Sequence, residues 1–137
     1  MDTVTAYQHA FVYIRQLAIH IRNAMTSMTE TELLLLILFT CRIHSVTNWQ
    51  FMNCLRLWTY MVTQPSLQEA FKPLVYPLIQ VIDSTINLIP TARYYPLRLH
   101  CIDLYIQISS VTGVYIPVAP LLLDVIEVPL RLAFSLE

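Results

Sequence analysis

Two arginines near the start of the sequence are spaced in a way that suits recognition of another molecule. Arg15 and Arg22 are seven residues apart, so on a helix they lie two turns apart on one face, and Gln8 extends that face. Arginine presents a fixed, planar fork of donors that matches carboxylates and phosphates. The pair is therefore either a solvated polar face or a strip that contacts a partner protein or RNA.

A second group of candidate contact residues occupies a connection between two apolar segments. It consists of Arg93, Tyr94, Tyr95 and Arg98. Pro90 and Pro96 account for the turn by themselves, and an ordinary turn needs only small or polar residues. Two phenols and two guanidinium groups at this place therefore need a further explanation.

Two interpretations of this turn remain open. In the structural one, a tyrosine packs under the neighbouring helices, and the arginines satisfy helix-end carbonyls or acids such as Asp83. In the functional one, the turn presents a ridge to RNA or to a partner protein. The structural interpretation is favoured because the footprint is small and the chain is slightly acidic. Because Pro96 restricts the residue before it, we expect the two tyrosine rings to point apart, one buried and one exposed.

The sequence lacks the common motifs of catalysis and of metal or cofactor binding. Its one glycine, Gly113, excludes the usual glycine-rich phosphate loops, and there is no GxSxG, HExxH or CxxC. His100 and Cys101 are adjacent, so on a helix they point to different sides and form no catalytic pair. The remaining cysteines, Cys41 and Cys54, are far apart, which is typical of buried thiols in a reducing compartment. We expect no enzyme, no catalytic residues, no cofactor, no metal and no small-molecule substrate.

The composition indicates a chain that needs neighbours. It is 56% hydrophobic and 12% charged, whereas soluble domains are about 45–50% apolar and about 25% charged. A membrane protein would explain this excess, but the longest uncharged stretch, between Asp103 and Asp124, contains polar residues and prolines. The apolar run Leu33–Phe39 has only seven residues, and a spanning helix needs about 20. We expect no membrane span, and we expect the isolated chain to self-associate through uncovered apolar ends.

Apolar spacing predicts one helical region over residues 1–137. A first helix is expected over residues 4–25, with an inward face of Val4, Tyr7, Phe11, Ile14, Ala18, Ile21 and Met25. Residues 26–47 are an atypical apolar insert or linker, in which Thr29 and Glu32 have capping-box spacing. Stacked helices are expected over residues 48–134.

The stacked helices are predicted from caps, prolines and apolar faces. Asn48 caps a helix whose inward face is Phe51, Leu55, Trp58 and Val62. The next two faces are expected to be Val75, Leu78, Ile82, Ile86 and Ile89, and then Leu97, Cys101, Leu104, Ile108 and Val111. Gly113 is expected to end the second of these helices. A last helix begins near Pro117 or Pro120, and Pro129 should break or kink it.

The spacing of three prolines favours a repeat architecture. Pro77, Pro96 and Pro117 are 19 and 21 residues apart, so two helices occupy 40 residues. HEAT-type helical pairs have a period of about 40–47 residues. The predicted class is an all-α, HEAT- or armadillo-like segment of an α-α superhelix, in which stacked pairs bury each other's faces.

Several stretches of the chain resemble a known protein family in their amino-acid sequence. They are "YQHAFVYIRQLAIHIRNAM", "NWQFMNCLRLW", "LVYPLIQVI", "LIPTARYYPLRLHCI" and "IPVAPLLLDVI". Together they resemble the conserved core of the nucleolar complex protein 2 family, assembly factors of the large ribosomal subunit in eukaryotes. The similarity runs from about Thr5 to Met25 and from Asn48 to Ile126.

The resemblance implies a non-enzymatic, helical scaffold in the nucleus, in the nucleolus and also the nucleoplasm. It implies related nucleolar complex proteins and pre-60S particles as partners, with RNA contacted indirectly. The family usually has a short polar, basic link where this chain has "TETELLLLILFTCRIH", and the family's charged flanks are absent. We therefore expect a central fragment or a truncated member. The alternative is a helical-repeat adaptor in another process, such as chromatin regulation or transport.

Overall fold

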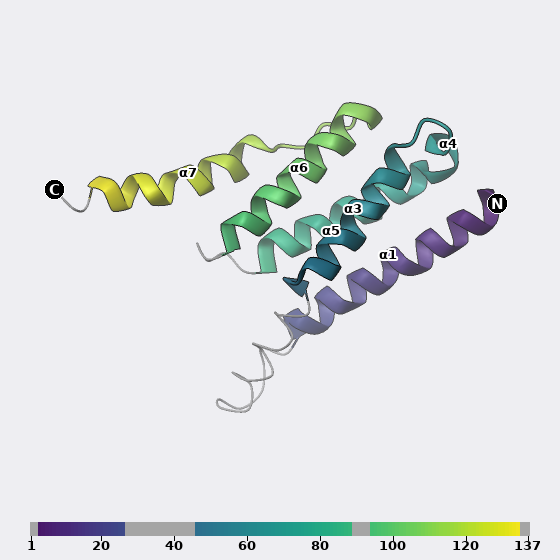
Figure 1. The fold of residues 1–137 in the computed structure, drawn as a ribbon, viewed down its shortest axis with the longest axis horizontal. Helices are drawn as coiled ribbons and strands as arrows, with labels where there is room; N and C mark the ends of the chain where they lie inside the picture. Colours follow the sequence, from purple (N-terminus) through teal and green to yellow (C-terminus); the bar gives the residue numbers. More distant parts are fainter. Residues whose placement is uncertain (1–2, 27–45, 89–93, 135–137) are drawn as a thin grey trace.

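The computed structural model describes residues 3–26, 46–88 and 94–134, with side chains up to residue 127, and every regular element in these ranges is helical (Figure 1). The elements are α1 (Thr3–Thr26), α3 (Trp49–Thr63), α4 (Gln68–Phe71), the 3-10 helix η2 (Lys72–Leu74), α5 (Val75–Leu88), α6 (Tyr95–Thr112) and α7 (Ala119–Phe134). The predicted all-α class is confirmed. Most of the predicted insert over residues 26–47, and the whole connection over residues 89–93, lie outside the described residues.

The helices form two antiparallel pairs that stack on one another (Figure 1). Tyr13, from the first half of α1, stacks on Trp58, from the second half of α3, with ring centroids 5.7 Å apart. Tyr105 in α6 donates a hydrogen bond of 3.4 Å from its hydroxyl to the carbonyl of Ile79 in α5. The pairs are thus α1 with α3 and α5 with α6. They stack with α1 beside α5 and α3 beside α6, whereas α7 packs against α6.

The core lies where the four long helices meet. Its fully buried side chains include Leu55 from α3, Leu78 and Ile82 from α5, and Leu104 and Ile108 from α6. These residues were predicted to face inward and are buried. Trp58, also predicted to face inward on α3, is only half-buried, and the structure additionally buries Met52, Thr59, Val81 and Thr85. Ile89, at the end of the predicted α5 face, lies outside the described residues.

Two local predictions about helix ends are confirmed. The Asn48 side chain accepts a 2.8 Å hydrogen bond from the backbone N–H of Phe51, which satisfies one of the free donors at the start of α3. Gly113 has φ of 69°, and its N–H donates to the Ser109 carbonyl at the end of α6. A side chain would strain this left-handed backbone, so the glycine ends α6 at little cost.

Pro129 was predicted to break or kink the last helix, and it does not break it, because α7 continues through this residue to Phe134. A proline inside a helix removes one backbone hydrogen bond and crowds the carbonyl four residues earlier. These effects are local and do not end the helix. No helix in the described ranges is long and apolar enough to cross a membrane.

The buried face of α6 is wider than predicted. Cys101, Leu104 and Ile108 are buried as expected, but Val111 is 40% exposed. Ile102, Tyr105 and Arg98 are also buried. The reason is that α6 packs against α3, α5 and α7, so no single stripe describes its buried surface.

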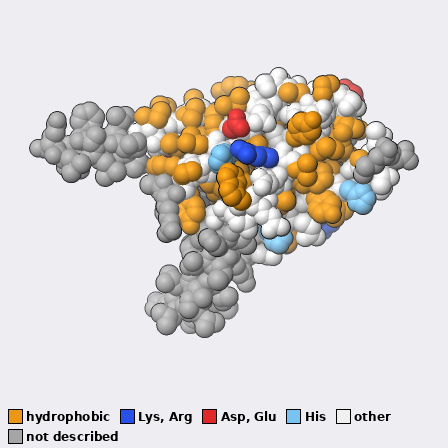
Figure 2. All heavy atoms as spheres, viewed as in Figure 1, with side chains coloured by type: hydrophobic (Ala, Val, Ile, Leu, Met, Phe, Trp, Pro, Cys, Tyr) orange, Lys and Arg blue, Asp and Glu red, His pale blue; other side chains and the backbone are white. Residues whose placement is uncertain are grey.

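The surface of the stack is strongly apolar. Figure 2 shows hydrophobic side chains spread over much of one face of the molecule, with few charged groups among them. The exposed apolar side chains include Val12 and Tyr13 on α1, Leu99 and Ile106 on α6, and Leu123 and Ile126 on α7. Such patches are unusual on monomeric proteins and mark interaction surfaces.

Candidate functional site

The buried face of α1 differs from the predicted one, and the difference creates a surface groove. Ile14 and Ile21 are buried as expected and Tyr7 is half-buried, but the other four predicted residues are exposed, namely Val4, Phe11, Ala18 and Met25. The helix instead buries Ala10, Leu17 and Ala24. Leu17 lines a hollow with Phe51 and Cys54 of α3, so α1 buries residues toward α3 as well as toward α5. The predicted inward face of α1 is therefore only partly correct, because apolar residues cover more than one stripe of this helix.

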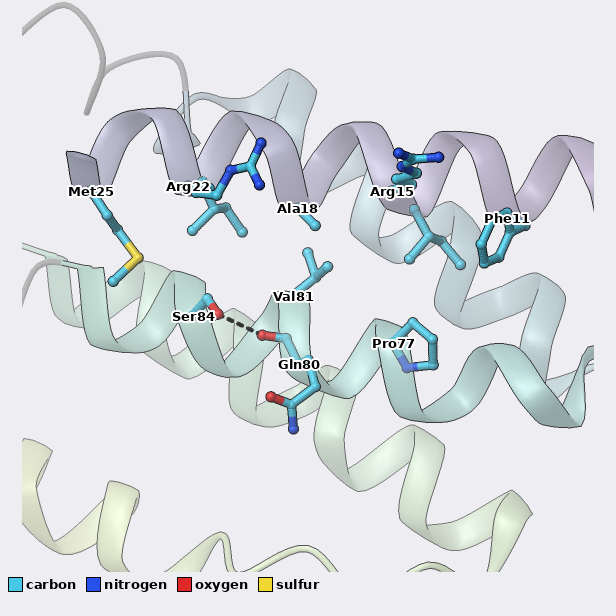
Figure 3. A pocket seen from close by; sticks show the side chains of 11 residues that line it. Phe11, Arg15, Ala18, Arg22, Met25, Pro77, Gln80, Val81 and Ser84 are labelled. Atoms are coloured by element: carbon cyan, nitrogen blue, oxygen red, sulfur yellow. Dashed lines mark hydrogen bonds between the residues drawn. The ribbon is translucent and has the colours of Figure 1, made fainter. Parts of the chain in front are cut away.

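The side chains that α1 leaves exposed form one wall of a groove against α5 (Figure 3). The groove has a volume of about 360 Å³. Its α1 side consists of Phe11, Ile14, Arg15, Ala18, Ile21, Arg22 and Met25, and its α5 side consists of Pro77, Gln80, Val81 and Ser84. Ile14, Ile21 and Val81 belong to the protein core, so the groove has a rigid apolar floor.

The seven-residue spacing on α1 explains the shape of the groove. Phe11, Ala18 and Met25 share one stripe, with a small side chain between two large ones. Ala18 therefore projects less into the groove than Phe11 and Met25 do. On the opposite wall, the Ser84 hydroxyl donates a 2.8 Å hydrogen bond to the Gln80 carbonyl, so it is already satisfied within α5.

The predicted contact residues Arg15 and Arg22 lie on the edge of this groove. Figure 3 shows both guanidinium groups on the α1 side, two turns apart and turned away from α5. No carboxylate is among the residues that line the groove. The Arg15 side chain makes neither a hydrogen bond nor an ion pair with another residue of the described part of the chain.

Arg98 has a different environment, at the start of α6. It is only 8% exposed, and its Nη2 lies 3.7 Å from Oδ2 of Asp124 in α7. Its guanidinium group also lies 5.9 Å from the centre of the Tyr95 ring. The acid is thus Asp124, and not Asp83, which the sequence had suggested. These contacts favour the structural interpretation of Arg98.

The expectation of one buried and one exposed tyrosine ring is wrong. Tyr94 and Tyr95 are both half-buried. Tyr95 is the first residue of α6, one turn before Arg98, which covers part of its ring. Tyr94 lines a hollow with Trp49, at the start of α3. Each ring is therefore shielded on one side by a different neighbour. Arg93 lies outside the described residues.

A cluster that sequence reasoning missed lies across α3 and α6. The ring centroids of Trp49 and His100 are 5.4 Å apart, and Arg56 lies 5.9 Å from the Trp49 ring centre. Arg56 Nη2 lies 3.2 Å from His100 Nδ1, so the imidazole accepts the bond in the tautomer that carries its proton on Nε2. Arg56 and His100 are 44 residues apart in the sequence. Only the pairing of α3 with α6 brings them together.

Comparison with known proteins shows the family. The sequence matches the profile of the Noc2p family over residues 1–132. This chain belongs to the Noc2p family. The resemblance noted from the sequence is confirmed.

Several relatives of this Noc2p-family chain are known by name. It is 40% identical over 127 residues to "Nucleolar complex protein 2" of Drosophila melanogaster, which covers 93% of the chain and 15% of that protein. It is 42% identical over 126 residues to "Nucleolar complex-associated protein 2" of Arabidopsis thaliana, covering 92% of the chain and 15% of that protein. "Protein REBELOTE" of the same plant is 31% identical over 126 residues, covering 92% of the chain and 20% of the relative. The chain thus spans about 15% of the length of the first two relatives.

The buried titratable groups of this family member have a structural role. Burial raises the pKa of the Cys101 thiol to about 12, so the thiol stays protonated at neutral pH. Burial, together with the charge of Asp83, also raises the pKa of Tyr105. A protonated, buried thiol is a poor nucleophile and a poor metal ligand. Among the described residues, no three His, Cys, Asp or Glu side chains are grouped so as to hold a metal ion.

Proposed function

We propose that this Noc2p-family chain is a non-enzymatic scaffold that takes part in assembly of the large ribosomal subunit within nucleolar complexes. Its partners would be related nucleolar complex proteins and pre-60S particles, and its location the nucleolus and nucleus. The names of the relatives from fly and plant support this proposal, since they describe components of nucleolar complexes. The two stacked antiparallel helix pairs support a HEAT-like repeat.

The exposed apolar surface is the structural observation that carries the proposal. The helices at both ends of the stack present apolar side chains to solvent, such as Tyr13 on α1 and Leu123 and Ile126 on α7. In a helical repeat each unit buries its faces against its neighbours, so uncovered faces indicate missing neighbours. Those neighbours would be further repeats or partner subunits. The isolated chain should accordingly self-associate, and a concentrated monomer with a sharp unfolding transition would contradict this.

Affinity purification of the tagged chain from nuclear extract tests the proposal. We expect nucleolar complex proteins and precursor RNA of the large ribosomal subunit to be recovered together. Recovery of only transport, coat or chromatin proteins would instead support an adaptor in another process. RNA sequencing and protein mass spectrometry of the same sample measure both outcomes.

A matched pair of variants connects the recovery to the exposed apolar surface. Leu123→Asp with Ile126→Asp places two charges on the uncovered side of α7 and should reduce recovery of the partner proteins severalfold. Asn53→Asp with Asn87→Asp adds the same charge at exposed polar positions of α3 and α5 and should leave recovery unchanged. Equal loss of recovery in both variants would indicate a general effect of added charge. The exposed apolar side of α7 would then no longer support the proposal.

A further inference from the structure

A hollow separate from the α1–α5 groove lies between the first turns of α3 and α6, which start at the same end of the stack (Figure 1). Trp49 and Met52 of α3 line one side of it, and Tyr94, Leu97 and His100 line the other. Its volume is about 270 Å³. Pockets for drug-sized ligands have volumes of about 300–1,000 Å³, so this smaller hollow suits a single planar ring system.

The side chains around this hollow are of the types that stack on nucleobases. Trp49 is 62% exposed, so most of its surface lies outside the core. The centre of the His100 ring lies 5.4 Å from that of Trp49, at an interplanar angle of 50°, and the Arg56 guanidinium group lies 5.9 Å from the Trp49 ring centre. Unpaired RNA bases stack on aromatic rings, on histidine and on guanidinium planes. Together with Tyr94, the cluster therefore has the composition of a base-binding site.

The hollow also offers hydrogen-bond donors that lack an acceptor. Nδ1 of His100 accepts from Arg56, so Nε2 carries the proton in this tautomer. Among the described residues, neither this N–H nor the Tyr94 hydroxyl has a hydrogen-bond partner. An aliphatic side chain placed here would cover both donors and leave them unpaired, which is costly. A nucleobase carries carbonyl and ring-nitrogen acceptors at its edge, so it pairs with such donors while its faces fill the apolar part of the hollow.

The charges beside the hollow suit one phosphate. Arg56 is exposed and directs Nη2 at His100, and a guanidinium group has five N–H donors, so others remain for a second acceptor. Arg56 forms no ion pair with any described residue. α3 contains no acid, and the acid of α6, Asp103, accepts a 2.9 Å hydrogen bond from Gln107. The charge of Arg56 is therefore available to a phosphate at the rim of the hollow.

We propose that this hollow binds one unpaired base of single-stranded RNA. The base stacks on the exposed part of the Trp49 ring, its edge accepts hydrogen bonds from Tyr94 and His100, and Arg56 contacts the adjacent phosphate. The proposal rests on the proposed function, because the RNA would be the precursor carried by pre-60S particles. It makes the contact with RNA direct, whereas the family resemblance implies an indirect one.

Fluorescence anisotropy of a labelled single-stranded oligouridine tests the proposal on the whole chain. We expect the single strand to bind, and binding to be about tenfold weaker once oligoadenosine pairs with it, because a paired base cannot enter the hollow. Trp49→Ala should weaken binding of the single strand about tenfold, in the range expected for loss of one stacked base. Trp49→Phe keeps an aromatic ring and should retain most of the affinity. The matched control is Tyr60→Ala, which removes a similarly exposed ring of α3 that does not line the hollow and should leave the affinity unchanged.

The salt dependence of binding separates the phosphate contact from the base contact. For single strands, the logarithm of the binding constant falls with the logarithm of the salt concentration, with a slope of about −0.7 per neutralised phosphate. Arg56→Gln should therefore make the slope shallower by about 0.7, and Arg56→Lys should preserve it. Trp49→Ala should weaken binding without changing the slope.

Three outcomes would overturn the proposal. They are absence of RNA binding, equal affinity for the single strand and the duplex, and unchanged affinity of Trp49→Ala. If Trp49→Ala keeps its RNA affinity but loses co-purifying proteins from nuclear extract, the hollow binds a protein instead. If the unmodified chain binds oligouridine at this site but recovers neither nucleolar proteins nor precursor RNA, the proposed function fails and the base-binding site stands.

Discussion

Arg15 and Arg98 are the same residue type, each on a helix and each a candidate contact residue from the sequence, yet their surroundings are opposite. Arg15 lies on the open edge of an apolar groove, with no acid among the lining residues. Arg98 is buried under α7, beside Asp124 and the Tyr95 ring. The difference is due to the neighbouring helix: α7 covers Arg98 and supplies an acid, whereas no described element covers Arg15 in this way. Whether an arginine stabilises the fold or remains available to contact a partner therefore depends on which element packs beside it.

The largest expected effect is a difference in the free energy of unfolding between a substitution in the floor of the groove and one in its wall. Ile21→Ala removes a side chain that is 2% exposed and should lower the free energy of unfolding by about 2–4 kcal/mol, because it leaves a cavity in the core. Phe11→Ala, on the exposed wall, should cost less than about 1 kcal/mol. Urea denaturation of both variants measures the difference. Similar losses would mean that the groove wall is part of the core.

The second prediction asks whether Arg98 acts through packing or through charge. Arg98→Ala should lower the free energy of unfolding by about 1–3 kcal/mol, since the side chain covers apolar surface with its stem. Arg98→Met keeps that stem volume and should cost less than about 1 kcal/mol. The ion pair is a modest contributor because the Asp124 side chain is 58% exposed. Thermal unfolding measures the stability of both variants. If Arg98→Ala and Arg98→Met are destabilised equally, the charge of Arg98, and not its packing, stabilises the fold.

The third prediction concerns pH and the buried side of α6. The pKa of Cys101 is raised from 9.0 to about 12 in the folded chain, so the unfolded chain loses this proton first as pH rises. Stability is therefore complete below pH 9 and falls between pH 9 and pH 12, by about 1.4 kcal/mol at pH 10 for this group. Tyr105 contributes in the same direction. In denaturant titrations, Cys101→Ala should be less stable at pH 7 but should lose less between pH 8 and pH 10; an unchanged slope would contradict the assignment.

The smallest effect on stability is expected at the edge of the groove. Arg15→Gln with Arg22→Gln should change the free energy of unfolding by less than about 0.5 kcal/mol, as exposed substitutions usually do. Recovery of the partner protein should nevertheless fall, because the charges are lost. Calorimetry combined with affinity purification measures both quantities. Unchanged recovery would mean that the two arginines form only a solvated face. Arg15 would then differ from Arg98 in its surroundings but would not be a contact residue.

Local features of this chain could be predicted because their causes lie within a few residues. Asn48 bonds the N–H three residues ahead, and Gly113 takes a left-handed backbone at the end of α6. Most of the inward faces of α3 and α5 followed from their apolar spacing, although each helix also buries residues beside the predicted stripe. The pair Arg15 and Arg22 was found in the same way, from its seven-residue spacing.

Long-range features could not be predicted, because they depend on how the helices turn toward one another. Apolar residues cover more than one stripe of α1, and only its packing decides that Leu17 is buried while Phe11 and Ala18 are left in a groove. Arg98 is 26 residues from Asp124 in the sequence, and the return of α7 along α6 makes them partners. The sequence alone determined the helices and the positions of their charges. The tertiary structure decided which of those charges are buried and which remain available, because burial depends on packing between distant segments.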